Sequence, residues 1–336
     1  MANNFELAKN YTSLLDEVYK NASVTADLNS DPAFAREGAN ANEILYPQID
    51  VSGLGDYDRK SGYTNGSVDV VWKTATYNYD RGTKIAVDTM DDEETFNIAF
   101  GRAGAELQRT KVAPEADAFT FATLAGLSGI SIGTAATFES ASDFLKALLD
   151  AKNQMDEDEV PDTDRRLYAT PTLINSVMAL DTTKSREVLA TFAAIRKVPQ
   201  SRFYTAIDLL DGKSSGEEAG HYKKAAGTYV ASTDTTVTAG KTYYTKSGNV
   251  YTAVTSPSGN PSTSSYYEQT VAPGKDINFM IIHKPAILKF DKHIAGDVIP
   301  PSLNADSDAY ILKYRKYGLV DAYRNKRAGI YLSHKA

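Results

Sequence analysis

The sequence predicts an α+β fold, because segments with strand character lie toward both ends of the chain and segments with helical character lie between them. Residues 43–87 and 277–333 are rich in β-branched and aromatic residues, which favour strands. In residues 88–195, the apolar side chains recur mainly at helical spacing. Residues 214–274 differ from both groups in composition, which indicates an inserted unit.

The composition is that of a globular protein large enough for two domains or one elaborate domain. Lys and Arg number 36 against 43 Asp and Glu, a formal charge of −7, so the whole chain is not a general nucleic-acid binder. The absence of cysteine excludes disulfides, thiol nucleophiles and cysteine-ligated metals. The start lacks a secretory pattern and no run approaches about 18 apolar residues, so we expect a soluble cytoplasmic product without a membrane partner.

The first 42 residues predict an N-terminal arm. Its first half carries an amphipathic helical stripe, formed by Leu7, Tyr11, Leu14 and Val18. Residues 21–42 are polar and small and show little periodicity, so we expect an extended segment that needs a surface to lie on.

Residues 43–51 and 67–79 predict the two strands of a long hairpin. Asn65-Gly66 is a tight-turn signal, because both central residues of a type I′ turn need a positive φ. The tip is polar and contains Asp56, Arg59 and Lys60. A projecting hairpin has little core of its own, so it is better suited to contact another molecule than to stand alone.

The strongest helix prediction begins at 88–94, where carboxylates in the first turn complement the positive end of the helix dipole. One face then carries Phe96, Phe100, Ala103 and Leu107. Pro114 predicts the end of this helix, and a second short helix is expected over 115–124. The carboxylates could also form a metal site, but no ligands follow at metal spacing, which favours a solvated helix start.

The middle of the chain predicts a mixed α+β unit. A helix is expected over 138–155 and a strand over 166–170. Pro171 then leads into helices over 173–180 and 185–195.

The insert at 214–274 contains no Leu, Ile, Met, Phe or Trp and is dominated by Ser, Thr, Gly and Tyr. Such a composition is typical of a disordered loop or of a small β unit with a Tyr/Val core. The segment 241–252 places β-formers around a turn at 247–249, which favours the β unit.

The end of the chain predicts further strands over 277–283, 286–290, 309–317, 319–324 and 328–333. Seven basic residues and a single acid follow Ala309; the basic residues are Lys313, Arg315, Lys316, Arg324, Lys326, Arg327 and Lys335. This pattern fits a surface that faces phosphates or an acidic neighbour, and it fits a solvated strand face equally well.

Candidate catalytic and metal-binding patterns are weak. Ser131 lies in a G-x-S-x-G pattern, but a helix is expected before it and none directly after it, unlike the elbow of serine hydrolases. The carboxylates Asp156, Asp158, Asp162 and Asp164 suggest a calcium loop, yet Pro161 and Leu167 stand where Gly and Glu are needed. The four histidines form no H-x-x-x-H pair. We therefore expect no enzyme activity and no cofactor or metal.

Three segments, 79–95, 277–286 and 313–327, occur in an order that resembles the major capsid protein of tailed bacteriophages, of the Hong Kong 97 type. The resemblance covers most of the chain except the insert. It implies an N-terminal arm at 1–42 and, at 43–78, a strand of the peripheral (P) domain and an extended E-loop. It further implies a P domain with a long spine helix at 79–130 and 290–336. An axial (A) domain at 131–289 would contain the insert, 214–274.

The resemblance also implies the function. Hexamers and pentamers of the chain would form an icosahedral shell around double-stranded DNA, assembled in the host cytoplasm and found in the virion. A separate scaffold protein and a portal would be partners, and the insert would project outward, where decoration proteins or host-surface ligands bind. Asp56, Arg59 and Lys60 at the hairpin tip, with Arg324 and Arg327, would be assembly contacts.

Some relatives crosslink their subunits through a lysine and an asparagine with the help of a glutamate. Lys60 and Asn325 match in kind, but no Glu follows Glu268, so we expect no covalent crosslink. Three alternatives remain at this stage. They are an encapsulin-like nanocompartment, a carbohydrate-binding adhesin suggested by the Tyr/Thr-rich insert, and, remotely, a serine hydrolase that uses Ser131.

Overall fold

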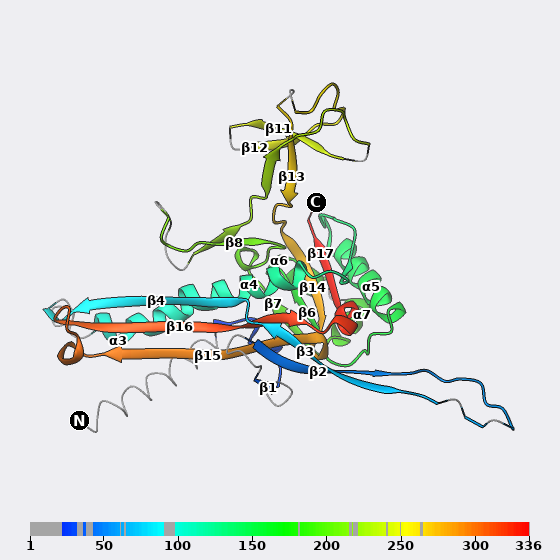
Figure 1. Cartoon of the computed structure of the whole chain (residues 1–336), viewed down its shortest axis with the longest axis horizontal. Helices are drawn as coiled ribbons and strands as arrows, with labels where there is room; N and C mark the ends of the chain where they lie inside the picture. The colour runs from blue at the N-terminus through cyan, green and yellow to red at the C-terminus, as the bar shows by residue number, and fades with distance from the viewer. Residues whose placement is uncertain are drawn as a thin grey trace.

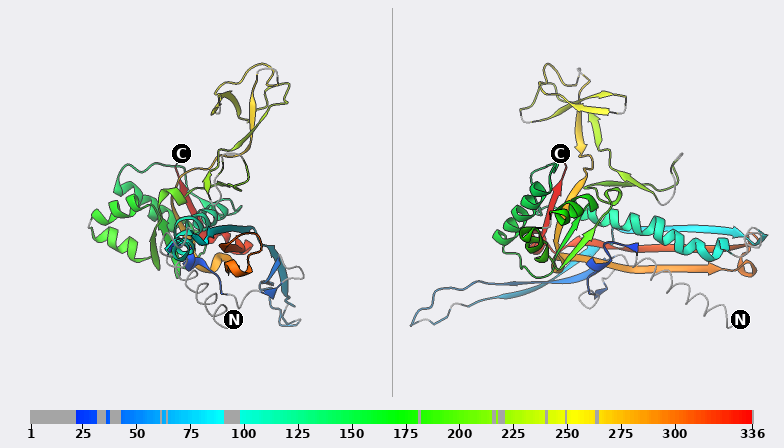
Figure 2. Two further views of the ribbon diagram at one scale, coloured as in Figure 1. Left: turned by 90° about the vertical axis from the view of Figure 1, so that its left-hand side faces the viewer. Right: turned by 180° about the vertical axis from the view of Figure 1, so that it is seen from behind.

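The computed structural model describes residues 22–31, 36–37, 43–60, 62–63, 65–90, 98–180, 182–214, 217, 221–239, 241–248, 250–262 and 265–335. An elongated body carries two projections (Figures 1 and 2). A long hairpin extends from one end of the body, and a small β unit projects above the body in the view of Figure 1. Within the described ranges, no helix is both long enough and apolar enough to cross a membrane.

A long three-stranded antiparallel sheet forms one half of the body. Its order is β15 (Ile287–Ile299), β16 (Ala309–Ala322) and β4 (Tyr79–Asp88). The two strands predicted over 309–317 and 319–324 are therefore one strand, because Gly318 continues it. A side chain at Gly318 would meet the Phe290 carbonyl oxygen at 2.4 Å, so glycine permits the close approach of β15 beside its register shift.

One long helical rod lies along this sheet (Figure 1). It consists of α3 (Ile98–Leu107), a π-helical turn (Gln108–Val112) and α4 (Ala113–Ala125). The predicted break at Pro114 is wrong. The π turn precedes the proline, which thereby occupies the first turn of α4, where a missing N–H is tolerated. Most of the predicted acidic start, residues 91–94, and Phe96 lie outside the described residues.

The central sheet has the order β5 (Ser131–Ile132), β17 (Ile330–His334), β14 (Ile277–His283), β6 (Arg165–Ala169) and β7 (Ala194–Lys197). Every residue of β14 is buried. Phe279 and Ile281 face helices α5 (Ala141–Glu157), α6 (Pro171–Ala179) and α7 (Thr183–Ala190), whereas Met280 and Ile282 face α4.

Two sequence predictions differ from this sheet. The helix predicted over 185–195 ends at Ala190, and the apolar residues after it continue into β7. The strand predicted over 328–333, which the resemblance assigned to the P domain, pairs with β14 and β5 of the central sheet, where Ile330 and Leu332 complete the core beneath α4.

The hairpin consists of β2 (Glu43–Val51) and β3 (Val68–Thr76), and β1 (Arg36–Glu37) pairs with the base of β2. Its root packs on the long sheet through Ile44, Tyr46 and Ala75. The chain does not reverse at Asn65-Gly66. The reversal lies at the bridge between Asp58 and Gly62, and a Cβ at Gly66 would lie 2.8 Å from the Ser52 hydroxyl on the opposite leg.

The insert is a β unit, as predicted. Strands β8 (Ile207–Leu209) and β9 (Tyr222–Lys224) pair at its base. Its sheet has the order β10 (Thr228–Ala231), β13 (Tyr267–Val271), β11 (Tyr243–Ser247) and β12 (Val250–Ala253). The core of the insert is formed mainly by tyrosine, because Val230, Val250 and Val271 are exposed while Tyr243 is fully buried. Short 3₁₀-helices at 26–28, 200–202, 284–286, 301–303 and 324–329 complete the fold.

Candidate functional site

The hairpin carries an exposed apolar surface on one of its faces. The register places Pro47 opposite Trp72, Ile49 opposite Val70 and Val51 opposite Val68. Directly paired residues of antiparallel strands share a face, so these six side chains form one continuous strip, here called the apolar strip. Ile49, Val51, Val68 and Val70 are each more than half exposed. Such a strip on a thin projection indicates a surface that another protein covers.

The predicted tip residues lie at the far end of this hairpin. Asp56, Arg59 and Lys60 are all exposed. The Lys60 amide donates to the Asp58 carboxylate at 2.9 Å, which closes the turn. Tyr57 and Tyr63 add a ring pair at 4.9 Å between centroids. The tip therefore combines charges with exposed aromatic groups.

The other predicted contact residues lie beside the hairpin root, where Tyr46 packs edge-on against Tyr323 at 5.3 Å. Arg324 is exposed in the helical turn after β16. Arg327 instead contacts its own chain: it donates to the Ser128 carbonyl at 2.9 Å and pairs with Asp321 at 3.6 Å. Within one subunit, the tip and these two arginines lie at opposite ends of the hairpin.

The basic cluster at the end of the chain is largely neutralised within the subunit. Arg315 pairs with Asp80 at 2.6 Å, Lys316 with Asp291 at 3.2 Å and Lys335 with Asp276 at 3.4 Å. The Arg315 guanidinium lowers the pKa of the Asp80 carboxyl. Because all three acids precede residue 310 in the sequence, the local count of charges overstated the free positive charge of this surface.

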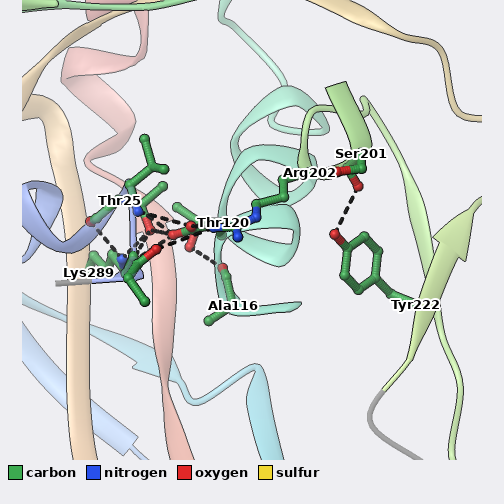
Figure 3. Close-up of polar contacts among 11 residues, drawn as sticks. Thr25, Ala116, Thr120, Ser201, Arg202, Tyr222 and Lys289 are labelled. Atoms are coloured by element: carbon green, nitrogen blue, oxygen red, sulfur yellow. Dashed lines mark hydrogen bonds and ion pairs between the residues drawn. The ribbon is translucent and has the colours of Figure 1, made fainter. Parts of the chain in front are cut away.

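A buried polar network joins the start of the described chain to three parts of the body (Figure 3). We call residues 22–31 the N-terminal clamp. Asp117 of α4 is fully buried and accepts hydrogen bonds from Ser23 Oγ (2.7 Å), Val24 N (2.9 Å), Thr25 N (3.1 Å) and Thr25 Oγ1 (2.7 Å). Arg202 pairs with the same carboxylate at 3.1 Å. One side chain thus anchors four donors of the clamp and an arginine from a distant segment.

The clamp also contacts the long sheet and the central sheet. Lys289 of β15 donates to the Thr25 carbonyl and hydroxyl oxygens, both at 2.9 Å. Asp27 pairs with Arg166 at 2.7 Å and accepts from Tyr168 Oη at 2.8 Å in the central sheet. Leu28 lies in the core. The segment predicted to need a surface to lie on therefore finds that surface, for residues 22–31, on its own subunit.

Two buried lysines lie close to this network. Burial lowers the pKa of Lys289. Burial also lowers the pKa of Lys316 to about 8, although Asp291 and Asp117 favour its charged form. The positive charge of Lys289, on the neighbouring strand β15, repels a charged Lys316 and lowers its pKa further. A charged Lys316 therefore makes the folded state less stable than a neutral one would, since burying a charge is unfavourable even when it is paired.

We expect Lys316→Met to change how stability depends on pH. The unfolded chain keeps the Lys316 proton up to about pH 10.5, whereas the folded chain releases it near pH 8, so wild-type stability rises between these values. The free energy of unfolding of the variant relative to wild type should thus fall by about 2 kcal/mol from pH 7.5 to 9.5. Urea unfolding measures this difference. The matched control is Lys313→Met at an exposed position of β16, and a pH-independent difference for Lys316→Met would refute the prediction.

The weak chemical patterns lie in structural positions. Ser131 begins a two-residue strand, with α4 before it and no helix until Ala141, and its Oγ donates to Asp158 at 2.8 Å. Arg165 pairs with Asp156 at 2.7 Å and with Asp162 at 3.2 Å, so part of the acidic loop holds an arginine. His221 contacts Lys111, and His283 lies buried in β14. No three His, Asp or Glu side chains of the described chain converge as a metal site.

Comparison with known proteins gives no match to any family model or to any curated protein sequence. Solved structures do match. The mature capsid of bacteriophage PhiM1 aligns with a TM-score of 0.50 at 13% identity, over 88% of this chain and 82% of that one. The chain has the Hong Kong 97-type capsid fold.

Other solved structures align at lower scores. The capsid of Staphylococcus phage Andhra gives a TM-score of 0.48 at 11% identity, over 92% of this chain and 84% of that one. The virus-like particle from Pyrococcus furiosus gives 0.48 at 9% identity, over 98% and 99%. The fold class predicted from the sequence is confirmed: the Hong Kong 97-type fold accounts for the hairpin, the long helical rod and the two sheets.

Proposed function

We propose that the chain is a major capsid protein, a structural and non-enzymatic subunit that assembles as hexamers and pentamers into an icosahedral shell around phage double-stranded DNA. The observation that carries this proposal is the apolar strip. Four of its side chains are exposed on a thin hairpin that has no further layer of its own chain to cover them: Ile49, Val51, Val68 and Val70. In the proposal, a neighbouring subunit covers these side chains. The Hong Kong 97-type fold supports a shell as the product of that contact.

In this proposal the parts of the fold take the roles that the sequence suggested. The hairpin is the E-loop, the long sheet and the helical rod form the P domain, and the central sheet with its helices forms the A domain. Because β17 belongs to the central sheet, the A domain would gain residues 330–334. The insert would project outward, where decoration proteins can reach it. The subunit would reside in the virion after assembly in the host cytoplasm.

The proposed contacts are distributed according to exposure. Asp56, Arg59, Lys60 and Arg324 are exposed and would meet neighbouring subunits. Arg327 would act indirectly, because its contacts with Ser128 and Asp321 hold the turn that presents Arg324. A scaffold protein would be a transient partner during assembly, and a portal would be a permanent one. Packaged DNA would make non-specific contacts with the shell.

Electron microscopy of the purified protein tests the proposal. The chain, expressed alone and together with the reading frames that neighbour its gene, should form closed shells of uniform diameter built from hexamers and pentamers. Particles from infected cells should protect double-stranded DNA from nuclease. Shells filled with one enzyme instead of DNA would favour an encapsulin-like compartment, and a monomer under both expression conditions would refute the proposal.

A further inference from the structure

The sheet of the insert has two unlike faces. Tyr243 and Glu268 lie opposite each other on one face, where residues 232–239 and Lys241 contact them. There Lys241 bridges Asp234 and Glu268, each at 2.8 Å, and Tyr243 donates to Asp234. This face is the interior of the insert, and its acids are held by a lysine.

The opposite face carries a cluster that we call the tyrosine face. It consists of Tyr229, Tyr244, Lys246, Tyr251, Tyr267 and Gln269, which the register places on the same side of four strands. All four tyrosines are partly exposed. Tyr229 stacks on Tyr251 at 4.1 Å, Tyr244 contacts Tyr229 at 5.0 Å and Tyr267 contacts Tyr251 at 5.2 Å.

The polar groups of this face point to a particular ligand chemistry. Gln269 donates to Tyr229 Oη at 3.1 Å and so orients both groups within the face. The Lys246 ammonium lies 5.5 Å from the Tyr251 ring centroid and 6.0 Å from that of Tyr267. Among the described residues, the face offers phenol rings, an amide and one cation but no carboxylate. Aromatic rings stack on the C–H groups of sugars, phenols and amides bond their hydroxyls, and a single ammonium complements a carboxylate.

Other partners fit the same face less well. A nucleic acid is disfavoured because one lysine cannot neutralise a phosphate backbone on a chain of net charge −7. An apolar helix would need an aliphatic groove, whereas this face is phenolic and amphipathic. The insert projects away from both the hairpin and the body, so an extended polymer can reach the face (Figures 1 and 2).

We propose that the tyrosine face binds acidic polysaccharide, a chain of sugars that bear carboxylates. The stacked tyrosines hold the sugar rings and Lys246 selects the carboxylate. This inference goes beyond the proposed function and does not require shells, because the whole face belongs to one subunit.

The experiment measures binding of the full-length protein, unassembled and as shells, to polygalacturonate, with neutral dextran as the comparison. We expect polygalacturonate to bind in both assembly states and to bind more tightly than dextran. Tyr251→Ser should weaken binding about tenfold through lost stacking, and Lys246→Gln should weaken it about tenfold and remove the preference over dextran. Lys223→Gln, an exposed lysine outside the face, is the matched control and should stay within about twofold.

Two results would overturn the inference: no binding of polygalacturonate by the wild-type protein, or Lys246→Gln and Tyr251→Ser proteins that bind as the control does. Lys246 contacts only ring faces in the described structure, so its variant tests the inference even if Tyr251→Ser fails to fold. Binding by the unassembled subunit separates this result from a failure to form shells.

Discussion

Replacing Ile49 and Val70 together by serine should leave a folded subunit that no longer closes shells at the wild-type concentration. The two side chains face each other across the hairpin and are 61% and 54% exposed in the single subunit, so their loss removes little from its own stability. Their burial against a neighbour contributes about 2 to 3 kcal/mol per subunit to assembly. The critical concentration for assembly should therefore rise about 30- to 150-fold, as measured by light scattering and electron microscopy across a concentration series.

The matched control lies on the opposite face of the same strands. Gln48→Ser combined with Lys73→Ser removes side chains of similar length without touching the apolar strip. This control should assemble close to the wild-type threshold, and circular dichroism should report the same fold for all three proteins. Unchanged assembly by the Ile49/Val70 variant would show that the apolar strip is not an intersubunit surface.

Asp117→Asn should destabilise the subunit by about 3 to 5 kcal/mol, because a buried carboxylate that accepts from four clamp donors and from Arg202 is replaced by a group with one acceptor and two donors. The loss should appear in urea unfolding. It should also appear locally, since the amides of Val24 and Thr25 donate directly to Asp117 and should exchange with deuterium much faster in the variant.

The control for this variant is Asp208→Asn, an exposed carboxylate on β8 that should change stability by less than about 0.5 kcal/mol. A loss below about 1 kcal/mol for Asp117→Asn, with unchanged exchange at Val24 and Thr25, would mean that the clamp is held by Asp27 and Leu28 rather than by the network around Asp117.

Local patterns in the sequence predicted the elements that depend on local physics. The alternation of β-formers gives β2 its observed limits, 43–51, and the turn at 247–249 joins β11 to β12 as expected. Composition alone separated the insert from the rest of the chain. For β2 and for the β11–β12 hairpin, the residues that carry the signal are the residues that form the structure, within about a dozen positions.

In the hairpin, the pairing of the two strands overrides the turn signal in the local sequence. Asn65-Gly66 has the right residues for a type I′ turn, but the register of β2 and β3 places Ser67 opposite Ser52, where Ser52 N donates to Ser67 O at 3.0 Å. Gly66 then lies on the returning leg. Its glycine is needed for the close approach to the Ser52 hydroxyl rather than for a positive φ.

The polar network of the clamp could not be predicted, because its partners lie far apart in the sequence. Thr25 and Asp117 are separated by 92 residues, and Thr25 and Lys289 by 264. A polar, aperiodic segment is typical of an arm without a core, and only the buried partners reveal that residues 22–31 are fixed. The acids that pair with Arg315, Lys316 and Lys335 also lie outside the local sequence, between 25 and 235 residues away.

The chain enters and leaves the four-stranded sheet of the insert at adjacent points. The Gly274 amide donates to the Ala225 carbonyl at 2.8 Å, and the Ala225 amide donates to the Ala206 carbonyl at 3.1 Å. A unit attached through adjacent ends imposes little loop-closure entropy on the rest of the chain, whatever its size. The junction at 225 and 274 is therefore a natural grafting point. A foreign domain with closely spaced termini can replace the part of the insert beyond this junction, and a shell built from such chains would display that domain in many identical copies.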